Sequence, residues 1–166
     1  MKAAVFRTFQ PKGILAGRRV YCDMDGVLAN FEAHYFAHFG ELRERHSGWA
    51  NIQKVPHFFR HIPPMDDMHE LWDAIKALRP YILTGVPTSI SNADNEKIEW
   101  IVEQCGKDVP VICCRARLKS LFCRDGDIII DDTAEYRPLW EQAGGVWIQH
   151  RNAAQTINAL KLLGIL

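Results

Sequence analysis

The stretch that most constrains the fold is 127–132, where three consecutive isoleucines are followed by two carboxylates. A strand with one face in water alternates apolar and polar side chains, whereas a continuous apolar run indicates a strand that is buried on both faces. Strands of that kind belong to parallel sheets whose two faces are covered by helices. We therefore predict a parallel sheet in which Asp131 and Asp132 lie at the carboxyl end of one strand.

Short apolar runs alternate with segments of helical periodicity from residue 20 onward. Strands are predicted at 20–23, 81–85, 109–113, 127–132 and 146–149, and helices at 30–40, 66–78, 92–106, 133–143 and 152–163. This alternation is typical of a parallel sheet built from βαβ units. We predict an α/β protein with a three-layer Rossmann-like sheet and helices on both faces. In the helix over 92–106, the side chains expected to face inward are Ile98, Ile101, Val102 and Cys105.

The length of 166 residues indicates one domain with a small insertion. The Rossmann-like core is predicted at 20–30 and 65–166, with a small helical cap at 31–64 inserted after the first strand. The insertion is rich in large side chains but too short to form a sheet core of its own. We expect it to pack as one or two helices over the mouth of the first strand. Residues 1–19, which carry Pro11, Gly13 and Gly17 as breakers, are predicted to form an N-terminal arm.

Reactive groups follow three of the predicted strands. Asp23 and Asp25, spaced i and i+2 and followed by a glycine, end the first strand and should lie on the same side. Two like charges at that spacing repel each other unless something offsets them, and Mg²⁺ prefers such oxygen ligands. Thr84-Gly85 and Asp131-Asp132 end two other strands. Ligands of such sheets bind beyond the carboxyl ends of the strands, so a magnesium site is predicted there.

Composition excludes several classes of partner. Lys plus Arg equals Asp plus Glu at 20 each, which argues against a nucleic-acid duplex or an anionic membrane as the main partner. No apolar run approaches the roughly 18 residues of a membrane span. The five cysteines are odd in number and form no C-x-x-C pair, which argues against a disulfide framework and favours a reducing, cytoplasmic location. The sequence leaves the oligomeric state open, with a homodimer as one option.

The motifs at the strand ends carry a family resemblance. D-M-D-G-V-L at 23–28, Thr84 after a strand, Lys119, and I-I-I-D-D ending at Asp132 resemble the four motifs of the haloacid dehalogenase-like superfamily. The resemblance covers nearly the whole chain from residue 20 onward. At finer grain, D-M-D-G-V-L-A-x-F-E, a paired Phe and G-D-x-x-I-D-D resemble the 5'(3')-deoxyribonucleotidases.

The resemblance implies a Mg²⁺-dependent phosphomonoesterase that works through an aspartyl-phosphate. Asp23 would be the nucleophile, and a carboxylate nucleophile splits one displacement into two. Asp25 would protonate the leaving oxygen and later take a proton from water. Thr84 and the amide of Gly85 would bind the phosphoryl oxygens, and Lys119 would hold the phosphate.

The resemblance also implies the metal ligands. Asp23, the backbone carbonyl of Asp25, and Asp131 with or without Asp132 would hold Mg²⁺, which stabilises charge in the transition state. For the phosphate lysine, Lys97 on the helix after the Thr84 strand is the alternative to Lys119. We favour Lys119, because it lies shortly before the Asp131 strand, as the family pattern implies. A lysine at the position of Lys97 is more often a solvated helix residue.

The aromatic residues of the cap give information about the class of substrate. By position, Phe31, Trp49, Phe58 and Phe59 match aromatics that stack the base in the deoxyribonucleotidases, which implies a deoxynucleoside monophosphate as substrate. From the residues alone, two readings of the cap aromatics stay open: they hold the insertion on the core, or some of them line a pocket for a flat ligand. A sugar phosphate or another small metabolite is the alternative substrate. A catalytically silent phosphate-binding module is the alternative of another class.

Overall fold

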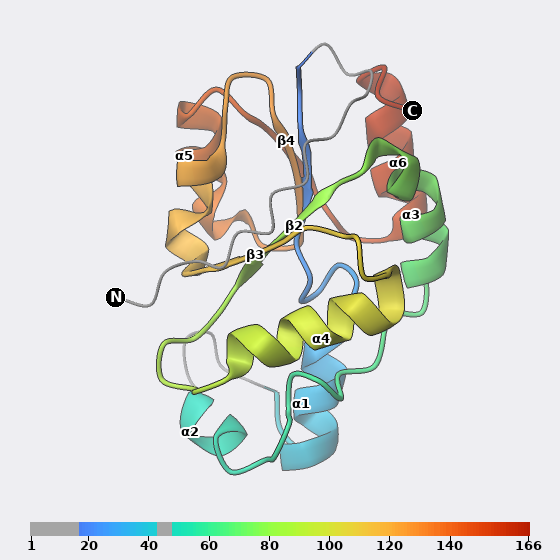
Figure 1. The fold of residues 1–166 in the computed structure, drawn as a ribbon. Coiled ribbons are helices and arrows are strands. Elements are labelled where there is room, and N and C mark those ends of the chain that lie inside the picture. Colours follow the sequence, from blue (N-terminus) through green and yellow to red (C-terminus); the bar gives the residue numbers. More distant parts are fainter. Residues whose placement is uncertain (1–16, 43–47) are drawn as a thin grey trace.

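Five strands form one parallel sheet in the order β3-β2-β1-β4-β5 (Figure 1). The computed structural model describes residues 17–42 and 48–166. The strands are β1 (Val20–Cys22), β2 (Tyr81–Gly85), β3 (Val111–Cys114), β4 (Ile128–Asp131) and β5 (Val146–Gln149). All strand pairs are parallel, with Tyr21 beside both Tyr81 and Ile129. The predicted α/β class and Rossmann-like sheet are confirmed.

The helices follow the predicted order, with shorter bounds. The α-helices are α1 (Phe31–Phe39), α2 (Trp49–Ile52), α3 (Met68–Ile75), α4 (Ala93–Cys105), α5 (Arg137–Gln142) and α6 (Ala153–Leu162). Three 3-10 helices are η1 (Lys76–Leu78), η2 (Ala116–Phe122) and η3 (Ala134–Tyr136). The single helix predicted over 133–143 is divided into η3 and α5. Pro138 lies in the first turn of α5, where a missing N–H costs no hydrogen bond.

The central strands have apolar side chains on both faces, as the isoleucine run predicts. Ile128 and Ile130 belong to the larger core cluster, which includes residues of α3, α4 and α6. Ile129 points the other way and packs with Tyr21 and Trp140 of α5. Figure 1 accordingly shows α3 and α6 together on one side of the sheet and α5 on the other. Successive side chains of a strand alternate between faces, so a run of isoleucines fills both cores.

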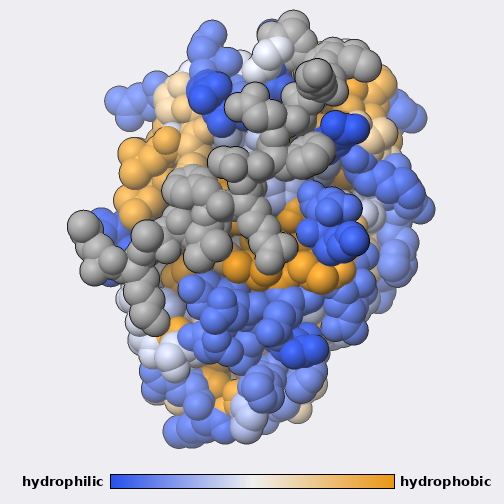
Figure 2. All heavy atoms as spheres, in the orientation of Figure 1, coloured by the Kyte–Doolittle hydropathy of each residue, from blue (hydrophilic) through white to orange (hydrophobic). Residues whose placement is uncertain are grey.

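The predicted inner face of α4 is only partly correct. Ile101 is fully buried, but Val102 is 39% exposed. Glu96, Lys97 and Trp100 are buried instead. Apolar periodicity missed the two charged residues because their polar atoms find partners inside the protein. On the opposite side of α4, hydrophilic residues face outward (Figure 2).

The cap leaves and rejoins the core at one place. Asn30 N donates to Pro63 O at 2.7 Å, and Met65 N donates to Leu28 O at 2.8 Å. The predicted boundaries at 31 and 64 therefore lie side by side, although residues 43–47 of the predicted cap are outside the described residues. Of the predicted arm, 1–16 are outside them too, and Arg19 pairs with Asp127 at the start of β4.

Helix α4 also holds the C-terminal part of the cap. Trp100 Nε1 donates to Ile62 O at 2.6 Å, and Arg60 Nη1 donates to Glu99 Oε2 at 2.7 Å. The backbone N–H of Phe59 donates to Glu96 Oε2 at 3.2 Å. We refer to these contacts between α4 and residues 59–62 as the α4 clamp.

Two further predictions concern cysteines and membranes. All five cysteines are free thiols, as their odd number and spacing predict. Within 17–42 and 48–166, the structure contains no helix with the length and apolar character needed to cross a bilayer.

Candidate active site

The turn after β1 brings the first motif to the edge of the sheet. Asp23 N donates to Ile130 O of β4 at 2.9 Å, which continues the sheet for one residue beyond the strand. Gly26 has a φ of 72°, a conformation that other residues resist. A Cβ at Gly26 would lie 2.4 Å from Oδ2 of Asp132. Glycine is therefore required here both for the turn and for the approach of the Asp132 carboxylate.

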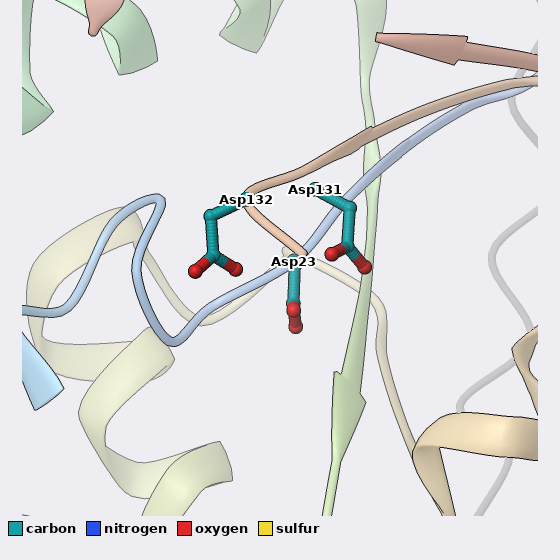
Figure 3. A group of neighbouring side chains, drawn as sticks. All are labelled: Asp23, Asp131 and Asp132. Atoms are coloured by element: carbon teal, nitrogen blue, oxygen red, sulfur yellow. The ribbon is translucent and has the colours of Figure 1, made fainter. Parts of the chain in front are cut away.

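Three carboxylates gather where β1 and β4 end. Asp23, Asp131 and Asp132 each offer an oxygen, and these oxygens lie within 4.8 Å of one another. Figure 3 shows the three side chains pointing to the same side from the two adjoining strand ends. Lys119 Nζ lies 2.7 Å from Oδ2 of Asp23 and 2.7 Å from Oδ2 of Asp131. Backbone amides hold the other oxygens, with Met24 N donating to Asp23 at 2.8 Å.

The single positive charge of Lys119 does not neutralise the three carboxylates. Burial, and then the charge of Asp23, raise the pKa of Asp131 to about 6. Desolvation and the charges of Asp23 and Asp131 raise the pKa of Asp132 to about 7, although Asp132 keeps contact with solvent. Burial alone lowers the pKa of Lys119, but the charges of Asp23 and Asp131 raise it above its ordinary value. The carboxylates therefore remain in mutual repulsion, which a bound cation would relieve.

The carboxylate group has the donor set and spacing of a magnesium site. Mg²⁺ binds oxygens at about 2.0–2.1 Å in octahedral geometry, which places neighbouring ligand oxygens about 3 Å apart and opposite ones about 4 Å apart. Oxygens of Asp23, Asp131 and Asp132 that lie within 4.8 Å of one another approach that spacing. The carboxylate of Asp25 is not part of this group. The chain's residues therefore fit the metal, with the Asp25 carbonyl remaining a prediction.

A second lysine organises the other predicted catalytic groups. Lys97 Nζ donates to Oδ2 of Asp25 at 2.6 Å, to Oγ1 of Thr84 at 3.1 Å and to the carbonyl of Gly85 at 2.7 Å. Lys97 is fully buried, so the expectation of a solvated helix residue is wrong. Burial raises the pKa of Asp25, although the charge of Lys97 lowers it. The other carboxylate oxygen of Asp25, Oδ1, is buried and has no hydrogen-bond partner among the described residues.

The clustered carboxylates and Asp25 line a cavity of about 620 Å³ at the carboxyl ends of the strands. Its volume is in the range of small-molecule sites. Of the predicted site residues, the structure brings the following to the cavity wall: Asp23, Asp25, Phe31, Trp49, Gly85, Lys119, Asp131 and Asp132. Thr84 and Lys97 are not among the lining residues. Lys119 thus lines the cavity and Lys97 does not, while the choice of Lys119 as the phosphate lysine stays a prediction.

The predicted base-stacking aromatics divide into two pairs. Phe31 and Trp49 line the cavity, with ring centroids 6.3 Å apart. Phe58 and Phe59 do not line it and are 2% and 1% exposed in the apolar core. The Phe58 ring lies 5.6 Å from that of Phe31, and Lys97 Nζ lies 5.2 Å from the Phe59 ring centroid. Phe58 and Phe59 therefore hold the cap on the core, whereas the binding of a flat ligand by Phe31 and Trp49 stays a prediction.

Comparisons with known proteins add little to this description of the fold. No protein-family model matches the sequence, and a search of curated proteins finds no match. Among solved structures, the chain is similar to a protein described as a hydrolase from Streptococcus pneumoniae TIGR4. The two are 13% identical with a TM-score of 0.47, and the alignment covers 89% of this chain and 98% of that one. Function is therefore argued from the residues of the cavity alone.

Proposed function

We propose that the chain is a Mg²⁺-dependent phosphomonoesterase that works through an aspartyl-phosphate on Asp23. The observation that carries the proposal is the pairing of each acid with its own lysine. Lys119 holds Asp23 beside two further carboxylates, and Lys97 holds Asp25, whose buried Oδ1 has no hydrogen-bond partner among the described residues. A nucleophile and an acid–base group, held separately and side by side, are what two-step phosphoryl transfer requires.

In the first step, an oxygen of Asp23 forms a bond to phosphorus while the bond from phosphorus to the ester oxygen breaks. Asp25 gives a proton to the leaving oxygen, and burial raises the pKa of its carboxyl group. Lys97, which is fully buried, keeps the Asp25 carboxylate in place. The products are the free alcohol and a phosphorylated Asp23.

In the second step, water attacks phosphorus and the bond to the Asp23 oxygen breaks. Asp25 takes the proton from the water, which releases inorganic phosphate and restores both carboxyl groups to their starting state. Lys119 and the amide of Gly85, both at the cavity wall, would hold the phosphoryl oxygens. A magnesium ion on Asp23, Asp131 and Asp132 would reduce the repulsion between carboxylate and phosphate and stabilise the transition state.

For the substrate we propose a nucleotide of the deoxynucleoside monophosphate kind. The supporting observation is that two aromatic rings, Phe31 and Trp49, line the same cavity as the carboxylates. A nucleobase that stacks on an aromatic side chain gains about 1–3 kcal/mol. A sugar phosphate has no planar base to stack on these rings.

The proposal is tested with a panel of phosphomonoesters that includes dUMP, dTMP, 3'-nucleotides, sugar phosphates and p-nitrophenyl phosphate. Each is assayed with Mg²⁺ and with EDTA. Release of phosphate in Mg²⁺, and its loss in EDTA, is the expected result. The absence of phosphate release from every member would contradict the enzyme assignment and favour a silent phosphate-binding module.

Trp49→Ala is expected to lower kcat/KM for nucleotides about 5- to 100-fold, because it removes one face of the aromatic pair. Hydrolysis of p-nitrophenyl phosphate should change by less than about twofold in the same variant. Steady-state kinetics on the two substrates give the comparison. Equal losses on both substrates would argue against base stacking. Trp49 is the suitable position, because Phe31 is 4% exposed and its removal would disturb the core.

Magnesium is expected to raise the unfolding temperature of the protein. An ion that binds only the folded state stabilises it by about 2.7 kcal/mol at a hundredfold excess over its Kd. The reason here is the relief of repulsion among Asp23, Asp131 and Asp132. Differential scanning calorimetry with and without Mg²⁺ makes the measurement, and Asp131→Asn/Asp132→Asn serves as the control. A shift of the same size in that variant would place the ion elsewhere.

A further inference from the structure

Two arginines at the cavity differ from the other cations there, because they have no acidic partner. Lys97 is paired with Asp25, and Lys119 is paired with two carboxylates. Among residues 17–42 and 48–166, neither Arg115 nor Arg117 takes part in a salt bridge with a described residue. Both are solvent-exposed and both line the cavity. Their charges are therefore available to a ligand in that cavity.

The backbone that carries these arginines is fixed against the predicted phosphate-binding residue. Ala116, which lies between them at the start of η2, is so close to Gly85 that a Cβ built there would lie 3.2 Å from the Ala116 Cβ. Val86 N donates to Cys114 O at 2.8 Å, and Leu118 N donates to Arg115 O at 2.8 Å. The arginines therefore project from a turn that is anchored against Gly85, rather than from a free surface loop.

The arginines and the proposed catalytic carboxylates follow the ends of different strands of the sheet. In the sheet order, β3 is two strands away from β1, and neighbouring strands are about 4.8 Å apart. Arg115 follows β3 and Asp23 follows β1, so their backbones are separated by about 10 Å in that direction. Lys119 already lies beside the nucleophile. The arginines are thus placed to meet a part of the substrate several bonds away from the reacting phosphorus.

We propose that the substrate carries a second anionic group, a phosphate or a carboxylate, which Arg115 and Arg117 bind. The guanidinium group matches both oxyanions through paired hydrogen bonds. This inference rests on the proposed phosphomonoesterase function and narrows its substrate. It refines the proposed deoxynucleoside monophosphate to a nucleotide with a second anionic group, such as a nucleoside bisphosphate, with a phosphorylated acid as the alternative.

Matched substrates test the inference, because each pair differs only in the second group. The phosphate arm compares deoxyadenosine 5'-monophosphate with deoxyadenosine 3',5'-bisphosphate. The carboxylate arm compares glycerol 3-phosphate with 3-phosphoglycerate. We expect kcat/KM to be about tenfold higher for the member with the second anionic group in at least one pair, and the arm that shows it identifies the group. Added salt should reduce that preference.

The double variant Arg115→Ala/Arg117→Ala is expected to reduce the preference to less than about twofold. Arg151→Ala is the matched control, since Arg151 is exposed and does not line the cavity but carries the same charge. The control should keep the wild-type preference. A preference that survives in the double variant, or that is absent in the wild type, would overturn the second-anion site.

Binding measurements separate this inference from the proposed function. Calorimetric titration of the Asp23→Asn variant with both members of each pair reports the preference without turnover. If no substrate is hydrolysed but the binding preference appears and depends on the arginines, the enzyme assignment fails and the second-anion site stands. If both members are hydrolysed and bound equally, the second-anion site fails and the phosphomonoesterase stands. If neither hydrolysis nor preference is found, both fail.

Discussion

Asp23→Asn is expected to lower phosphate release by about 10⁴-fold or more. The substitution keeps the shape of the side chain and its contact with Met24 N, but an amide cannot serve as the nucleophile. Phosphate release in Mg²⁺ gives the rate. Mass spectrometry after acid quenching should show a phosphorylated wild-type protein and an unphosphorylated variant.

Asp66→Asn is the matched control, because Asp66 is exposed and does not line the cavity. It should retain wild-type activity. Substantial activity in Asp23→Asn would exclude Asp23 as nucleophile, and a wild-type protein that releases no phosphate would favour the binding-module alternative.

Lys119→Met is expected to destabilise the protein by about 3–5 kcal/mol, because it leaves Asp23 and Asp131 without their shared partner. Lys119 is 4% exposed, and the two carboxylates are 7% and 2% exposed. Breaking a buried ion pair from one side leaves an uncompensated charge, which costs more than the pair contributes. Denaturant unfolding in the absence of Mg²⁺ gives the free energy of unfolding.

The controls for this variant separate charge from packing. Adding Asp131→Asn to Lys119→Met should recover part of the lost stability, because one of the two uncompensated charges is removed. Lys161→Met, at an exposed position in α6, should change stability by less than about 0.5 kcal/mol. A loss of under about 1 kcal/mol in Lys119→Met would mean that the carboxylates are not held by this lysine.

The sheet and the strand-end residues were predictable because they depend on short, local patterns. The Ile128–Ile130 run has no polar position, so only a strand covered on both sides accommodates it. Asp23 and Asp131 follow adjacent parallel strands, and the topology alone brings such positions to one edge.

What the sequence could not give is the choice of partners among buried charges. Lys97 lies at a position that periodicity assigns to solvent, yet it is buried because Asp25, more than seventy positions away, accepts a hydrogen bond from its ammonium group. Helical periodicity is read from apolar side chains only, so it cannot indicate a pair of buried charged side chains. A buried charge with a long-range partner becomes visible only when the fold places both groups together. For the same reason, the sequence could not separate the cap aromatics into two pairs. Trp49 and Phe59 are both aromatic residues of the cap, but Trp49 lines the cavity and Phe59 is buried in the core.

The α4 clamp has a consequence for how turnover proceeds. The helix that holds residues 59–62 of the cap also carries Lys97, which contacts the carboxylate of Asp25, the proposed acid–base group. A hinged opening of that segment would have to break these contacts or drag the lysine away from its carboxylate. Entry and exit of small molecules should therefore take place by diffusion through the cavity mouth, with this part of the cap staying seated. The reaction rate would then be set by bond breaking or product escape rather than by the swing of a lid.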